Sequence, residues 1–68
     1  MRLDFNQHGS WRKGPDFDER DLNLVMEDSA KLADLILAKL RIVGEIGEVL
    51  WYRDHGWEWH RSGPRERS

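Results

Sequence analysis

The strongest periodic pattern of the chain lies in residues 18–43, DERDLNLVMEDSAKLADLILAKLRIV. Acidic side chains gather at the start of this stretch and basic ones near its end, which matches the two poles of a helix dipole. Asp16 or Asp18 can cap the first turn, and Gly44 suits the position just after the last one. The stretch therefore predicts one long helix over about residues 18–43.

The apolar side chains of this helix form two stripes when residues are placed about 100° apart. Leu24, Leu35 and Ile42 fall together, away from the main stripe that should cover a sheet. Burying one large aliphatic side chain stabilises a fold by roughly 1.5–3 kcal/mol, and a chain this short has a net stability of only about 3–5 kcal/mol. We therefore expect this seam to be covered by a second copy, by another protein or by the chain's own aromatic segment.

The flanks of the helix carry strand patterns. Leu3 and Phe5 alternate with polar residues, which predicts a short N-terminal strand. Residues 49–53 and 57–61 are rich in aromatic side chains and flank Asp54-His55-Gly56, a tight-turn sequence. They predict a C-terminal hairpin.

The expected fold is α+β, with one long amphipathic helix packed on a small antiparallel sheet made of the C-terminal hairpin and the N-terminal strand. The alternative is an all-α helical hairpin, because Ile46, Val49 and Leu50 also fit a helical face. Residues 1–62 are expected to form a single small domain, and residues 63–68 a flexible tail.

Composition excludes several function classes. The chain of 68 residues has 11 basic and 13 acidic side chains, a net charge of −2 at pH 7 and no cysteine. It is neither a polycation for phosphate binding nor a strongly acidic mimic of DNA. The longest apolar stretch of the helical region, Leu35–Ala38, is far shorter than the about 20 residues of a membrane span, so we expect a cytoplasmic protein without membrane contact.

The sequence contains no recognised catalytic motif. No serine lies in a nucleophile elbow, and the glycines form no phosphate-binding fingerprint. His8, His55 and His60 lack a recognised zinc spacing. We therefore expect no enzyme activity, no catalytic residues, no metal and no cofactor.

Residues 44–52, Gly44-Glu45-Ile46-Gly47-Glu48-Val49-Leu50-Trp51-Tyr52, resemble a characteristic helix of MazG-type nucleotide pyrophosphohydrolases. The resemblance covers these nine residues. In that family paired carboxylates on two helices hold magnesium against a nucleoside triphosphate. The resemblance implies that Glu45 and Glu48 would be ligands and that hydrolysis would depend on magnesium.

The preferred hypothesis for function is a small non-catalytic protein–protein interaction module, acting through a protein partner, through self-association as a dimer, or both. In size and composition the chain resembles stoichiometric inhibitors of nucleic-acid-handling complexes, such as anti-CRISPR and anti-restriction proteins. The expected partner-binding residues are Leu24, Leu35, Ile42, Glu27, Asp28, Asp34, Trp51, Trp57 and Trp59.

The alternative hypothesis is a small nucleic-acid-binding protein. Aromatic rings can stack on single-stranded bases while arginines hold phosphates. The residues for this role would be Arg53, Trp57, Trp59, Arg61 and the tail arginines Arg65 and Arg67.

Overall fold

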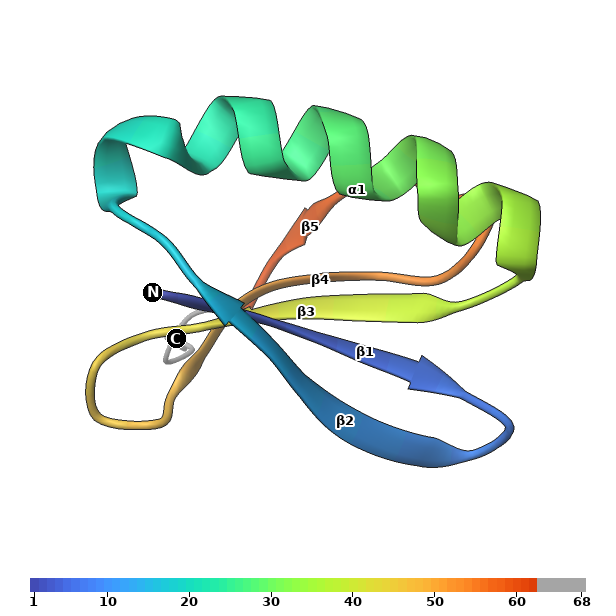
Figure 1. Cartoon of the computed structure of the whole chain (residues 1–68), viewed down its shortest axis with the longest axis horizontal. Coiled ribbons are helices and arrows are strands. Elements are labelled where there is room, and N and C mark those ends of the chain that lie inside the picture. The colour runs from blue at the N-terminus through green and yellow to red at the C-terminus, as the bar shows by residue number, and fades with distance from the viewer. Residues whose placement is uncertain (63–68) are drawn as a thin grey trace.

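A computed structural model of the chain describes residues 1–62, which form a five-stranded antiparallel sheet and one α-helix (Figure 1). The strand order is β2-β1-β3-β4-β5. The elements are β1 (Arg2–Gln7), β2 (Ser10–Asp16), the 3-10 turn η1 (Glu19–Asp21), α1 (Leu22–Ile36), β3 (Lys39–Val43), β4 (Val49–Arg53) and β5 (His60–Arg61). The expected flexible tail lies outside the described residues.

Residues 1–62 form two layers, because α1 covers one face of the sheet and no other helix or strand of this range covers the opposite face (Figure 1). Side chains of directly paired strand residues share a face. Phe5 pairs with Leu40 and Leu3 with Ile42, and these side chains lie under α1. The buried apolar residues are Ala33, Ala38, Leu40, Ile42 and Val43. Leu3, Phe5, Ile36 and Trp59 pack against the cluster of Ala33, Ala38 and Leu40.

The predicted helix over residues 18–43 is wrong at its C-terminal end. The helix α1 ends at Ile36, and Leu37 adopts a left-handed conformation with φ of 58°. The N–H of Ala38 then donates to the carbonyl of Ala33 at 2.9 Å, which closes the last turn. The chain reverses here, and residues 39–43 become the central strand β3.

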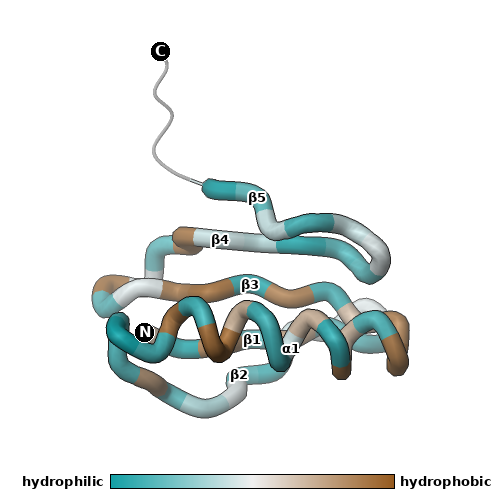
Figure 2. Tube along the Cα trace, turned by 90° about the horizontal axis from the view of Figure 1, so that it is seen from above, coloured by the Kyte–Doolittle hydropathy of each residue, from teal (hydrophilic) through white to brown (hydrophobic). Residues whose placement is uncertain are grey.

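Residues 39–43 alternate basic and apolar side chains, which Figure 2 shows as alternating hydrophilic and hydrophobic bands along β3. This alternation fits a strand with one buried face, and β1 and β4 supply its two partners. Ile42 was expected on an outward seam. It is instead fully buried at the centre of the sheet.

The expected fold class is also wrong. The strands hold more residues than α1, and the sheet includes β2 and β3 in addition to the predicted N-terminal strand and C-terminal hairpin. The all-α alternative fails because Val49–Arg53 is strand β4, paired with β3. No helix within residues 1–62 has the length and apolar character needed to cross a membrane.

At one position in the sheet, the close approach of two strands requires a glycine. A Cβ atom at Gly14 in β2 would overlap the carbonyl oxygen of Leu3 in β1. The tight contact therefore requires a residue without a side chain, and it lets β2 lie close to β1.

Candidate functional site

The face of the sheet that α1 leaves uncovered is the candidate functional site, and we call it the open face. A row of paired residues crosses four strands on this face. Asp4 of β1 pairs with Arg41 of β3, Arg41 with Tyr52 of β4, and Tyr52 with His60 of β5. Asp4 also pairs with Lys13 of the edge strand β2. The strand register therefore brings together residues from both ends of the described chain.

Three large aromatic side chains are exposed here: Trp11 by 41%, Tyr52 by 42% and Trp57 by 53%. The ring of His60 stacks on Tyr52 at a centroid distance of 5.6 Å and meets Trp57 edge-on at 5.6 Å. We call these four residues the aromatic cluster. Trp11, Tyr52 and Trp57 line a hollow of about 210 Å³, with Lys39 and Asp54 at its side. Leu40 and Arg53, whose side chains lie on the α1 side of the sheet, also line it.

The hollow is smaller than the about 300–1,000 Å³ of pockets for drug-sized ligands. It lies between aromatic side chains of β2, of β4 and of the turn after β4. Such a site suits a single planar ring better than a whole cofactor, because the surrounding rings offer flat apolar surfaces for stacking.

Basic side chains lie among these rings. The Arg41 guanidinium is 4.2 Å from the ring centroid of Trp11, a cation–π contact. The ammonium of Lys39 is 4.0 Å from the carboxylate of Asp54. At this distance and exposure the pair is weak, so Lys39 stays available to an anionic ligand.

Asp4 organises the arginines of the open face. Its side chain is only 1% exposed and accepts hydrogen bonds from Arg2 Nε at 2.7 Å, from Arg2 Nη2 at 3.0 Å and from Arg41 Nε at 3.1 Å. Burial raises the pKa of the Asp4 carboxyl, but the hydrogen bonds and charges of Arg2 and Arg41 outweigh it, so the pKa lies below its usual value. Asp4 thus holds Arg41 in place over Trp11.

Charge is divided between the two layers. Residues 18–36, which include η1 and α1, carry six acids and two bases. The open face carries a small surplus of positive charge. Its basic residues are Arg2, Lys13, Lys39 and Arg41, and its acids are Asp4, Asp16 and Asp54.

Arg53, one of the predicted nucleic-acid residues, lies on the other face. Its side chain is 4% exposed and joins α1 to the turn after β4. It donates to the carbonyl of Ala30 at 3.3 Å, to Asp34 at 3.0 Å and to the carbonyl of Trp57 at 3.0 Å. The backbone N–H of Gly56 and the guanidinium of Arg53 lower the pKa of Asp34 against the opposing effect of desolvation. Arg53 is therefore structural.

The predicted tryptophan set is divided between the two faces. Trp59 packs against the core and donates its indole N–H to the carbonyl of Met26 at 3.0 Å. Trp51 is half-buried on the α1 side, with the Arg61 guanidinium 5.4 Å from its ring. Only Trp57 joins the aromatic cluster. Arg65 and Arg67 lie outside the described residues.

Only two of the three apolar side chains of the predicted seam are exposed. Leu24 is 59% exposed and Leu35 is 80% exposed on the outer side of α1, whereas Ile42 is buried. Glu27 and Asp28 are exposed beside them. The expected role as a partner-binding inhibitor therefore stays a prediction that rests on α1 alone.

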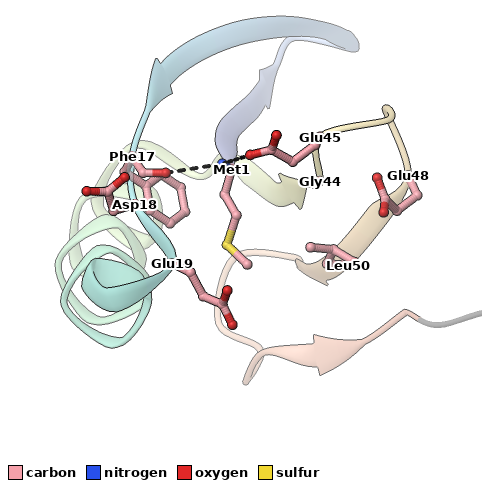
Figure 3. A pocket seen from close by; sticks show the side chains of 8 residues that line it. All are labelled: Met1, Phe17, Asp18, Glu19, Gly44, Glu45, Glu48 and Leu50. Atoms are coloured by element: carbon pink, nitrogen blue, oxygen red, sulfur yellow. Dashed lines mark hydrogen bonds and ion pairs between the residues drawn. The ribbon is translucent and has the colours of Figure 1, made fainter.

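A second hollow of about 210 Å³ lies beside the β3–β4 turn (Figure 3). Its lining residues are Met1, Phe17, Asp18, Glu19, Gly44, Glu45, Glu48 and Leu50. The Met1 amine donates to the carbonyl of Phe17 at 3.1 Å and is 4.0 Å from the Glu45 carboxylate. The Glu48 carboxylate accepts the backbone N–H of Ile46 at 3.2 Å.

The magnesium site implied by the pyrophosphohydrolase resemblance is therefore not formed. Residues 44–52 are a turn and a strand instead of a helix, and Glu45 and Glu48 have other partners. Within residues 1–62, no group of three or more His, Asp or Glu side chains could hold a metal ion.

Sequence reasoning missed Trp11, Lys39, Arg41 and Tyr52 as site residues. The alternation of basic and apolar residues in 39–43 was the available signal, because it places Lys39 and Arg41 on one side of a strand. No family model, no curated protein and no solved structure matches this chain.

Proposed function

We propose that the chain is a non-catalytic binding protein that takes single-stranded nucleic acid on the open face. The observation that carries this proposal is the exposure of Trp11, Tyr52 and Trp57 around one hollow, with basic side chains beside them. Unpaired bases present flat apolar surfaces that stack on such rings, and their phosphates are attracted to neighbouring lysines and arginines.

The architecture supports a single strand as the ligand. Bases inside a duplex are stacked on one another and are not available to an aromatic platform, whereas a single strand can splay its bases across a sheet. Within residues 1–62, no helix lies over the open face (Figure 1). The aromatic cluster is therefore accessible to an extended chain.

The net charge of −2 is compatible with this ligand because the acids are concentrated in the other layer. At physiological ionic strength, charges separated by more than about 8 Å of solvent are largely screened. The acids of η1 and α1 therefore act weakly at the open face, where an approaching phosphate meets four basic residues and three acidic ones. We also propose a cytoplasmic location, because a protein that binds nucleic acid must share a compartment with it.

Binding can be measured by the fluorescence anisotropy of labelled single-stranded DNA and RNA oligonucleotides of about 12 nucleotides, within the range of known site sizes. Stacking of one base is worth about 1–3 kcal/mol, so Trp57→Ala and Tyr52→Ala should each weaken binding by about 5- to 150-fold. Ile46→Ala is the matched control, because Ile46 is 86% exposed in the β3–β4 turn, away from the aromatic cluster.

Salt dependence tests the electrostatic part of the proposal. If Lys13, Lys39 and Arg41 each contact a phosphate, the logarithm of the binding constant should fall with the logarithm of salt concentration with a slope of about −2, because each single-strand contact contributes about 0.7. Lys39→Gln should reduce this slope by about 0.7. Absence of oligonucleotide binding at about 50 mM salt, or equal binding by the Trp57→Ala, Tyr52→Ala and control variants, contradicts the proposed function.

A further inference from the structure

The side of α1 that faces away from the sheet carries a regular strip of four exposed residues. Leu24, Asp28, Lys31 and Leu35 follow one another at intervals of four, three and four positions. This spacing is that of the contact seam of a coiled coil. Leu24 and Leu35, at the two ends of the strip, are 59% and 80% exposed. Figure 2 views the molecule from this side, where no other helix or strand of residues 1–62 lies over α1.

We call these four residues the α1 strip, and their positions are symmetric about its midpoint. Leu24 and Leu35 are equally far from the midpoint of the strip, and so are Asp28 and Lys31. A twofold axis through that midpoint would place Leu24 against the partner's Leu35 and Asp28 against the partner's Lys31. Every contact would then be made twice, as a closed symmetric dimer requires.

We propose that α1 is a self-association surface, on which a second copy of this chain docks with its helix antiparallel. Charge complementarity favours a second copy of the chain in the antiparallel orientation. Asp28 and Lys31 are both exposed and make no ion pair within residues 1–62, so each can pair with its counterpart across the axis. A parallel arrangement would instead place aspartate against aspartate and lysine against lysine, which opposes association.

The border of the strip is compatible with this arrangement. Leu32, which is 59% exposed, extends the apolar surface on one side. On the other side lie the acids Glu27 and Asp34, and Asp34 is already paired with Arg53 at 3.0 Å. The twofold axis places this acidic side against the same side of the second copy, and the Asp34–Arg53 pair reduces the resulting repulsion in part.

The dimer would have both helices in the middle and both sheets outside, because α1 and the open face lie on opposite sides of the protomer (Figure 1). The two open faces would point in opposite directions. One dimer could then hold two separate strands or two segments of one long strand. This consequence rests on the proposed function, whereas self-association does not depend on it.

The test is sedimentation velocity of the full chain from about 5 to 500 μM, a range that covers the weak affinity expected of a short two-helix interface. We expect a concentration-dependent shift from monomer to dimer. Asp28→Lys and Lys31→Asp should each weaken the dimer by at least about tenfold, because each places two like-charged pairs across the axis. The combined Asp28→Lys, Lys31→Asp variant restores both pairs and should dimerise within about threefold of the original chain.

Leu35→Glu should also abolish the dimer, whereas Ile46→Glu, at an equally exposed apolar residue far from α1, should leave it unchanged. Far-UV circular dichroism checks that each variant is folded. A chain that stays monomeric over the whole concentration range overturns the inference. Failure of the combined charge swap to restore association also overturns it, because antiparallel pairing predicts that recovery.

Discussion

Replacing Asp4 by asparagine removes the negative charge at the centre of the open face and keeps the size of the side chain. The carboxylate is 1% exposed and accepts three hydrogen bonds from Arg2 and Arg41, at 2.7, 3.0 and 3.1 Å. An amide cannot accept all three, and its N–H₂ group would face an arginine donor. Removing one partner of a buried ion pair costs about 3–5 kcal/mol. Both arginine side chains are 29% exposed and can turn toward water, so we expect the lower end of that range.

A loss of about 3 kcal/mol is large for a chain whose net stability is about 3–5 kcal/mol. In a domain of this size each kcal/mol shifts Tm by about 4–8 °C, so Tm should fall by about 12–24 °C. Thermal and urea unfolding followed by far-UV circular dichroism measure both quantities. Glu58→Gln, a change of the same chemistry at an exposed residue, should stay within about 0.5 kcal/mol of the original chain. A cost below about 1 kcal/mol for Asp4→Asn would refute the role of this carboxylate as the organising ion pair.

The same carboxylate makes stability depend on pH. The folded-state pKa of Asp4 lies below its usual 3.8, since the hydrogen bonds from Arg2 and Arg41 outweigh the effect of burial. Its contribution is therefore fully present above the unfolded pKa and is lost as the pH falls through the folded pKa. Between about pH 5 and pH 2, the free energy of unfolding should fall more steeply for the original chain than for Asp4→Asn. Equal pH profiles of the two proteins would contradict this account.

Three further substitutions test the fold, each by the free energy of unfolding in urea. Leu37→Gly should raise it by about 1 kcal/mol, because a left-handed conformation costs a residue with a side chain about 1–2 kcal/mol and Leu37 is 66% exposed. Gly14→Ala should lower it by about 2 kcal/mol or more, because the added methyl group overlaps the carbonyl of Leu3 and the two strands must separate. Arg53→Lys should lower it by about 2–3 kcal/mol, because a lysine cannot keep all the hydrogen bonds to α1 and to the turn after β4.

Matched variants serve as controls for these three. Leu35→Gly, inside the last turn of α1, should lower stability by about 1 kcal/mol, which is opposite in sign to Leu37→Gly. Gly44→Ala should cost less than Gly14→Ala, since the added methyl group would meet only the mobile end of the Glu48 side chain. Arg61→Lys, at an exposed position, should be close to neutral. A destabilised Leu37→Gly variant would show that its backbone conformation is not strained.

Local patterns predicted part of the fold. Strand β4 has the predicted bounds, because Val49–Arg53 combines β-branched and aromatic residues before a turn with glycine at positive φ. The end of α1 was not predictable in this way. Residues 37–43 satisfy the helical period and the strand period alike, and Leu37 takes the left-handed position that glycine usually signals. Pairing with a strand more than 30 residues away, as in Phe5 with Leu40, decides between the two structures.

The open face was harder to predict because it is assembled from residues far apart in the sequence. Trp11 and Arg41 meet only once β1 lies between β2 and β3 in the sheet. A two-residue period places Trp57 and Trp59 on the same side of an extended strand, but β5 begins at His60, and the two tryptophans diverge. The sequence thus contained the chemistry of the site, whereas the strand order determines which rings and charges face the same way.

The two proposed surfaces lie on opposite sides of the protomer, so we expect them to act independently. Coupling would require that a ligand at one surface makes different contacts in the monomer and the dimer. Within residues 1–62, no hydrogen bond or ion pair joins Trp11, Tyr52, Trp57 or His60 directly to the α1 strip, although Arg53 connects the carbonyl of Trp57 to Asp34 at its border. A short oligonucleotide should therefore bind the original chain and the Leu35→Glu variant, which is expected to stay monomeric, with the same affinity per site. A long strand that reaches both open faces should favour the dimer, because the second contact becomes intramolecular. A change of more than about tenfold in the short-oligonucleotide affinity would mean that the two layers are coupled, since such a factor corresponds to about 1.4 kcal/mol.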